Sequence, residues 1–190
     1  MFFRALLDQP ERLWRFLGLF QSPPLRLVHV LAASFVLLQL VSGVVMEIGS
    51  PVFWYHAWAG ASLFLLALIL SVYSLKARGP RHFYPYLWGD AAALKHDLRQ
   101  AVHFKLPPPH PGGLEAVVQG AGLVLLALTA FLGLTWFALW QAGSAYAKTA
   151  LPFHKTGGVL IFFYVVAHGG MATRRFIVWQ RNSKAAGLKA

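Results

Sequence analysis

The sequence contains no cysteine and very few acidic residues. Without cysteine the chain can form no disulfide, no thiolate metal site and no cysteine-ligated iron–sulfur cluster, so any metal must use histidine or carboxylate. Only 6 of the 190 residues are Asp or Glu, and charged residues make up 12% of the chain against 57% hydrophobic residues. A soluble domain needs more polar surface than this composition supplies, so we expect an integral membrane protein.

Four apolar stretches are long enough to cross a bilayer, which takes about 20 residues in a helix. We expect spans at about 27–46, 51–75, 114–140 and 154–178, with a long connection over 76–113. The predicted fold is an all-α, integral membrane four-helix bundle that forms a single transmembrane domain over residues 1–190. An amphipathic interfacial helix over about 10–20 precedes the first span, and a further helix over about 90–104 lies in the connection.

The basic residues flank these spans unevenly. Of the 17 Lys and Arg residues, all except Lys148 and Lys155 lie before the first span, in the long connection or after Met171 near the end of the fourth span. The positive-inside rule therefore predicts that both termini and the connection are cytoplasmic. Topology explains the net charge of +11, and we expect no nucleic-acid partner.

Four of the 8 histidines fall within the predicted spans, where ionisable residues are rare and usually functional. His154 and His168 are 14 residues apart in the fourth span. A helix turns about 100° and rises about 1.5 Å per residue, so both imidazoles lie on one face about 21 Å apart in depth. His29 begins the first span at the cytoplasmic side, and His56 begins the second at the periplasmic side. Depth therefore pairs His56 with His154 and His29 with His168.

The other four histidines lie in the connection, where we expect them to face solvent or lipid headgroups and predict no metal ligand among them: His82, His96, His103 and His110.

Two histidines alone are an incomplete metal site. Zinc takes four ligands, or three and a water, and no carboxylate or thiol accompanies either pair, so the pattern favours a metal that brings its own equatorial ligands. Haem does so, and without a Cys-x-x-Cys-His motif it would be held non-covalently, as b type. Arg26 and Lys155 are placed to meet haem propionates, or to extend toward headgroups.

Glycines near the histidines would let a flat macrocycle approach the helices, although small residues also serve ordinary helix packing. They are Gly43, Gly60, Gly120, Gly122, Gly133, Gly157, Gly158, Gly169 and Gly170.

The segments LRLVHV, HAWAG and HKTGG…VVAHGG resemble the bacterial di-haem cytochrome b561 family, over about residues 25–175. This family includes the membrane cytochrome b subunits of nickel-iron hydrogenases and formate dehydrogenases. The resemblance implies a multi-pass protein of the bacterial inner membrane with two haems b. It implies that His56 and His154 hold the periplasmic haem, and His29 and His168 the cytoplasmic one. It also implies that electrons enter from a periplasmic partner and leave to quinone near the cytoplasmic haem.

The long connection and the lack of histidine in the third span make the chain look closer to partnered subunits than to stand-alone relatives. Partnered members often carry an Asn-containing turn before the third span, but here the turn reads His110-Pro111-Gly112-Gly113. By position, His110, Glu115 and Gln119 are candidate quinone-binding residues. Glu115 also suits a helix N-terminus, where the dipole favours a negative charge.

The expected function is therefore electron relay between a periplasmic redox partner and the quinone pool, with no catalytic residue of its own. Two alternatives stay open: a stand-alone quinone oxidoreductase fed by superoxide or a small donor, and a non-redox membrane scaffold or transporter. A homodimer is also left open.

Overall fold

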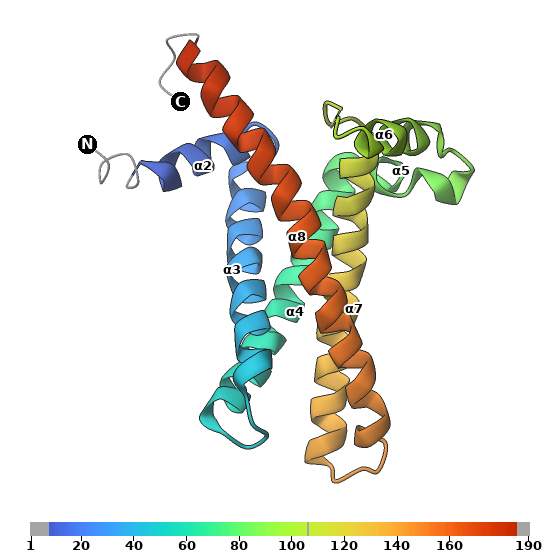
Figure 1. Cartoon of the computed structure of the whole chain (residues 1–190). Helices are drawn as coiled ribbons and strands as arrows, with labels where there is room; N and C mark the ends of the chain where they lie inside the picture. The colour runs from blue at the N-terminus through green and yellow to red at the C-terminus, as the bar shows by residue number, and fades with distance from the viewer. Residues whose placement is uncertain (1–7, 106, 186–190) are drawn as a thin grey trace.

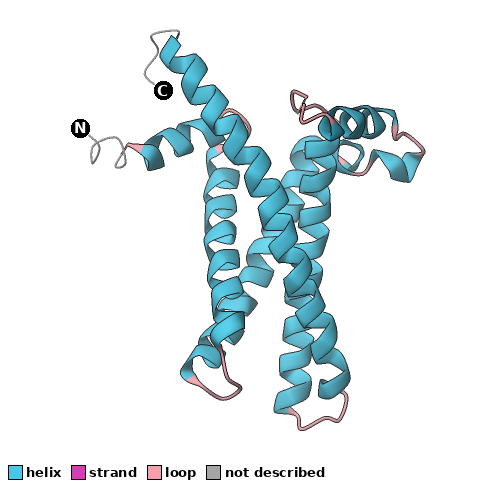
Figure 2. Cartoon of the chain, in the orientation of Figure 1, coloured by secondary structure: helices cyan, strands magenta, loops and turns pink. Residues whose placement is uncertain are grey.

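The computed structural model describes residues 8–105 and 107–185, and all regular structure in those ranges is helical (Figure 2). The helices follow in the order α2 (Gln9–Leu17), α3 (Pro23–Val45), α4 (Pro51–Arg78), α5 (Pro80–Phe83), the 3₁₀ helix η1 (Pro85–Trp88), α6 (Ala92–Val102), α7 (Leu114–Gln141) and α8 (Ala147–Ala185). Within the described ranges, α3, α4, α7 and α8 are long and apolar enough to cross a membrane, which confirms the prediction of four long apolar helices.

The fourth long helix differs most from its predicted limits. The sequence predicts a start at about His154, but α8 begins at Ala147, so His154 lies well inside the helix. The helix begins before the apolar run, directly after a turn in which Tyr146 N–H donates to Ser144 Oγ at 3.3 Å. With 39 residues, α8 is about 58 Å long and exceeds a bilayer core of about 30 Å.

Close packing of the long helices follows a chain in which α3 packs on α4, α4 on α7 and α7 on α8. Between the described residues, the backbone of α8 makes no comparable contact with α3 or α4. Small residues at the centre, such as Ala32 and Ala67, are buried with Leu63, Leu126 and Ile161. In Figure 1 the α3–α4 and α7–α8 hairpins separate toward their loops. The bundle is therefore held by three adjacent helix contacts, and α8 faces α3 and α4 across a wider spacing.

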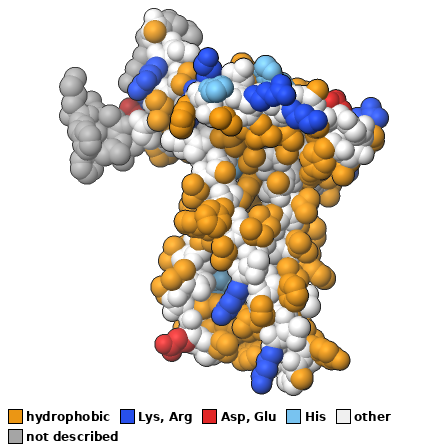
Figure 3. All heavy atoms as spheres, turned by 45° about the vertical axis from the view of Figure 1, so that its right-hand side comes forward, with side chains coloured by type: hydrophobic (Ala, Val, Ile, Leu, Met, Phe, Trp, Pro, Cys, Tyr) orange, Lys and Arg blue, Asp and Glu red, His pale blue; other side chains and the backbone are white. Residues whose placement is uncertain are grey.

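The two ends of the bundle differ in structure and charge. We call the end with α2, α5, η1, α6 and the last turns of α8 the basic end, and the end with connections 46–50 and 142–146 the short-loop end (Figure 1). Lys and Arg side chains gather at the basic end, while large apolar side chains cover the shaft between the ends (Figure 3). Exposed Val44 (85%) and Trp58 (66%) are examples of these apolar side chains, as expected of faces that contact lipid.

The helix predicted over about 10–20 is α2, which ends at Leu17. Its Phe16 is buried against Phe176 and Trp179 of α8, with ring centres 5.4 and 5.7 Å apart, while Leu13 and Trp14 are exposed. The helix predicted over about 90–104 is α6, from Ala92 to Val102. Both helices therefore lie at the basic end, where α2 is fastened to α8.

Gly122 sets the approach of α7 to α8. A Cβ atom built on Gly122 would overlap the ring of Tyr164 on α8, whereas one built on Gly170 would meet nothing within 4 Å. The contact at Gly122 therefore depends on the absence of a side chain.

We predict that Gly122→Ala lowers the free energy of unfolding by about 1–3 kcal/mol, because the Tyr164 ring must move. Gly170→Ala is the matched control and should change stability by less than about 1 kcal/mol, since its site is open. Thermal unfolding in detergent measures both, and equal stability of the two variants would contradict this packing.

Candidate functional site: two histidine pairs

The first pair brings together His56 of α4 and His154 of α8 in the half of the bundle near the short-loop end. Their ring centres are 6.1 Å apart and their planes cross at 76°. Side chains of all four long helices line a cavity of about 630 Å³ beside them, and Lys155 is among these side chains. The two histidines that were paired by depth therefore face one another beside a large, mainly apolar space.

Hydrogen bonds define the protonation of both rings in this pair. His154 Nδ1 lies 3.0 Å from the carbonyl of Thr129, which can only accept, so Nδ1 carries the hydrogen. The Ser42 hydroxyl donates to the Leu38 carbonyl at 2.7 Å, and its oxygen accepts from His56 Nδ1 at 2.8 Å. These contacts assign the hydrogen of each neutral ring to Nδ1 and leave both Nε2 atoms with a free lone pair.

Glycines make room for these two rings. A Cβ on Gly43 would lie 3.3 Å from Cε1 of His56, and one on Gly133 would lie 2.7 Å from Cε1 of His154. Gly158 also lines the cavity, and a Cβ there would meet nothing within 4 Å. Gly60 lines the same cavity and faces Gln39, whereas Gly157 makes room for Thr129 of α7.

The second pair consists of His29 of α3 and His168 of α8, nearer the basic end. Their ring centres are 6.2 Å apart and their planes cross at 82°. His168 stacks on Tyr164 with ring centres 5.3 Å apart and planes 7° from parallel. The Nδ1 atom of His29 is buried and has no hydrogen-bond partner among the described residues. The two pairs thus share their spacing but differ in what supports each imidazole.

A cavity of about 320 Å³ at the basic end is lined by both histidines of the second pair and by all three predicted quinone residues, His110, Glu115 and Gln119. The lining also contains Arg78, Tyr164 and Arg175, which the sequence does not single out, and His82, which the sequence places toward solvent or lipid headgroups.

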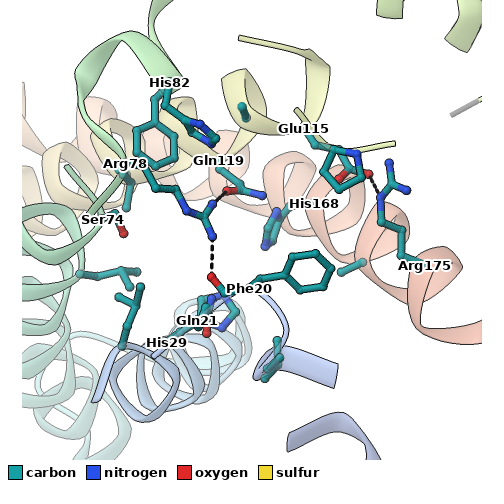
Figure 4. A pocket seen from close by; sticks show the side chains of 18 of the residues that line it. Phe20, Gln21, His29, Ser74, Arg78, His82, Glu115, Gln119, His168 and Arg175 are labelled. Carbon is teal, nitrogen blue, oxygen red and sulfur yellow. Dashed lines mark hydrogen bonds and ion pairs between the residues drawn. The ribbon is translucent and has the colours of Figure 1, made fainter. Parts of the chain in front are cut away.

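Arg78 crosses this cavity. It donates from Nη1 to Gln119 Oε1 at 2.9 Å and from Nη2 to the Phe20 carbonyl at 2.8 Å, as Figure 4 shows. In the sequence Arg78 is read only as one of the flanking basic charges, because its partners are distant along the chain. It joins the end of α4 to α7 and to the turn before α3.

Glu115 lies in the first turn of α7 and forms an ion pair with Arg175 of α8 (Figure 4). Arg175 also donates from Nη2 to the carbonyl of Pro107. The side chains of Arg175 and Glu115 are only 19% and 11% exposed, so the pair is largely removed from water. Glu115 therefore combines the helix N-terminal position with a tie to α8.

His110 is held by Asp97, a residue of α6 that is 3% exposed. His110 Nε2 lies 3.1 Å from Asp97 Oδ1, and the other carboxylate oxygen accepts from Leu114 N–H at 2.8 Å. The hydrogen bond to Asp97, together with a second to the Pro111 carbonyl, raises the pKa of His110.

The pKa of His82, another residue that lines this cavity, is lowered by burial and, to a smaller extent, by the nearby cation of Arg78.

The two residues predicted to meet propionates are differently placed. Lys155 lines the cavity beside His56 and His154. The guanidinium of Arg26 lies over the ring of Trp14 at 4.4 Å and donates to the Trp14 carbonyl at 2.8 Å, and Arg26 is not among the side chains that line the basic-end cavity. Arg78, on the adjacent helix α4, lines the basic-end cavity where Arg26 does not.

Across residues 8–105 and 107–185, no group of three or more His, Asp or Glu side chains is placed to hold a metal ion. His96 and His103 are exposed on the outside of α6 and its end. A metal at either histidine pair would consequently need further ligands that the described part of the chain does not supply.

These features define a helical membrane protein with two opposed-imidazole sites, one toward each end of the bundle. A family model described as prokaryotic cytochrome b561 matches residues 21–185. The chain belongs to this family, which confirms the resemblance seen in its histidine segments and implies b-type haem and electron transfer in a prokaryotic membrane. No curated protein and no solved structure shows significant similarity to it.

Proposed function

We propose that the chain is a di-haem cytochrome b that relays electrons across the bacterial inner membrane between a periplasmic redox partner and quinone. In this proposal His56 and His154 hold one haem iron, and His29 and His168 hold the other. The observation that carries it is the spacing within the pairs, whose ring centres are 6.1 and 6.2 Å apart.

That spacing fits one metal between two imidazoles. An imidazole nitrogen binds a metal at about 2 Å and the ring centre lies about 1 Å behind the nitrogen, so two rings on opposite sides of one metal have centres about 6 Å apart. Direct contact between the helices is not what sets this distance, because the backbone of α8 is not closely packed on α3 or α4.

The hydrogen bonds of the first pair also fit the group. A metal-bound histidine normally donates its other ring N–H to an oxygen, which fixes the ring and raises its basicity as a ligand. The Ser42 hydroxyl and the Thr129 carbonyl are such acceptors for His56 and His154. Bound at these sites, haem would supply one-electron transfer through its ferric and ferrous states.

The protein contributes position and charge. Residues His154 and His168 lie on one helix, so α8 supplies a ligand to each site at depths about 21 Å apart. Lys155 is the cation nearest in sequence to the first pair and lines its cavity, where it suits a propionate. At the second pair, Arg78 is the lining cation without a carboxylate partner in the described ranges, and it suits this role in place of the predicted Arg26, which lies outside the lining. The other lining cation, Arg175, is paired with Glu115.

The basic-end cavity is the site we propose for quinone. His29 and His168 line it themselves, so quinone there would lie next to the haem that this pair would hold, and the lining also contains His110, Glu115 and Gln119, which can hydrogen-bond to quinone oxygens. The uneven distribution of Lys and Arg supports a cytoplasmic location for this end. The periplasmic partner would then dock at the short-loop end.

Single histidine variants test the pairing. We expect His168→Ala to lose the haem of the basic-end site and with it quinone reduction, while the other haem remains, so the haem content per chain falls by about half. We expect His56→Ala to lose the other haem and block entry of electrons from the partner. Haem content and the reduced-minus-oxidised spectrum measure both.

The control is His103→Ala, since His103 is exposed and lines neither cavity. This variant should keep the full haem content. Two haems retained in His168→Ala, or loss of the same haem in His168→Ala and His56→Ala, would contradict the assignment.

Reporter fusions test the orientation. A reporter that is active only in the cytoplasm should be active after the C-terminus, and one active only in the periplasm should be active in the connection 142–146, because the basic end stays on the cytoplasmic side. The reverse pattern would exchange the two sides of the membrane in this proposal.

A further inference from the structure

The turn over residues 110–113 is built around a buried carboxylate. Asp97 on α6 accepts from the Leu114 N–H at the start of α7, and its other oxygen meets His110 Nε2. A Cβ on Gly113 would lie 2.5 Å from Asp97 Oδ2 and 2.6 Å from His110 Cε1, so only glycine leaves room for this contact. The turn is also tied to the end of α5, because Gly112 N–H donates to the His82 carbonyl at 3.0 Å.

Both ring nitrogens of His110 meet acceptors. Nε2 lies 3.1 Å from a carboxylate oxygen of Asp97, and Nδ1 lies 3.2 Å from the carbonyl of Pro111. A carboxylate and a carbonyl can only accept, so this arrangement suits a ring that carries hydrogen on both nitrogens. The raised pKa of His110 has the same cause.

The His110 side chain is 37% exposed and also lines the basic-end cavity. It can therefore exchange protons with water on one side and meet a ligand in the cavity on the other. Its partner Asp97 is buried and fixed by the backbone of α7.

The other charged or titratable groups that line this cavity are less suited to give up a proton. Glu115 of α7 is ion-paired with Arg175 of α8, and Arg78 of α4 is a permanent cation. The lowered pKa of His82 on α5 favours its neutral form. Tyr164 stacks on His168, and His29 and His168 are the proposed ligands.

We infer that His110, held by Asp97, is the proton donor to quinone in the basic-end cavity. This inference depends on the proposed function, because it assumes quinone reduction there. Reduction of a quinone to a quinol takes two electrons, which the reduced partner protein supplies, and two protons. His110 gives the proton for the oxygen nearer the turn: in this step the Nδ1–H exchanges its hydrogen bond to the Pro111 carbonyl for one to the quinone oxygen, and then the Nδ1–H bond breaks and a quinol O–H bond forms.

His110 is left neutral, with its remaining hydrogen on Nε2 facing Asp97, and regains a proton at Nδ1 from water. The second quinone oxygen takes its proton from the aqueous phase. Asp97 acts through His110 as a positioning residue, since it orients the ring and stabilises its charged form. Because Asp97 raises the pKa of His110, it favours the charged form of the ring, which is the form that can donate this proton.

The test uses the haem-loaded full chain in lipid nanodiscs, reduced with dithionite and mixed with decylubiquinone, with haem reoxidation followed by stopped-flow absorbance. At pH 7 we expect His110→Gln to slow reoxidation about a hundredfold, as is typical for loss of a general acid. His103→Gln, an exposed histidine at the end of α6, is the matched control and should react at the wild-type rate.

The pH dependence of the rate in Asp97→Asn tests the role of the carboxylate, because loss of structure alone would not shift this dependence to lower pH. The His110 pKa is raised by Asp97, so the charged ring persists to higher pH in the wild type; without the carboxylate the charged form is lost at lower pH. We expect the alkaline fall in rate to move to lower pH. The NMR titration of the His110 ring should move in the same direction, and that measurement is independent of activity.

These outcomes distinguish failure of the proposed quinone reduction from failure of the role inferred for His110. A wild-type protein that quinone does not reoxidise would overturn the proposed function. Normal wild-type reoxidation, together with an unchanged rate and pH profile in His110→Gln of wild-type haem content, would overturn this inference alone. An unchanged His110 titration in Asp97→Asn would overturn the role of the carboxylate.

Discussion

The two histidine pairs depend on a space between α8 and the helices opposite it that close backbone packing does not fill. In each pair one histidine comes from α8 and the other from a helix on which α8 is not closely packed. The chain of contacts through α4 and α7 keeps α8 at that distance. A bundle closed as tightly between α8 and α3 as between α7 and α8 would have no room for a planar group. Both histidine pairs thus lie on the less closely packed side of the bundle.

Polar groups within the apolar shaft lie next to the histidine rings and hold their positions. Ser42 and the Thr129 carbonyl face the ring nitrogens of the first pair, and Gly43 and Gly133 leave room for the same rings. Toward the basic end the polar groups become charged, with the Glu115–Arg175 ion pair at the rim of the cavity. The neutral hydrogen bonds around the first pair suit an electron carrier. The charged groups at the basic end suit a reaction that consumes protons.

Hydrophobic periodicity and charge predict the helices and their topology because both are properties of short stretches of sequence. The length of the apolar runs predicts four spans, and the 14-residue spacing of His154 and His168 predicts two depths on one face. The pairs that depth alone suggests are the pairs that lie together in space. Their role as haem ligands stays a prediction, supported by family membership and by the ring spacing.

The remainder of the site depends on contacts between distant segments. The Arg78 guanidinium meets Gln119 and the Phe20 carbonyl, residues far from it in the chain, so its flanking position alone predicts only topology. Asp97 becomes a partner of His110 because α6 folds back onto the start of α7. The sequence also places the start of α8 too late, since hydropathy marks the apolar run and not the helical residues that precede it.

The most direct test of the central claim is the low-temperature electron paramagnetic resonance spectrum of the oxidised protein. Imidazole planes that cross near a right angle leave two iron d orbitals almost equal in energy, which produces a highly anisotropic low-spin signal. With planes at 76° and 82°, both sites should give signals of this type. A high-spin ferric signal, a single low-spin centre or a spectrum without haem would contradict two bis-histidine sites in this bundle.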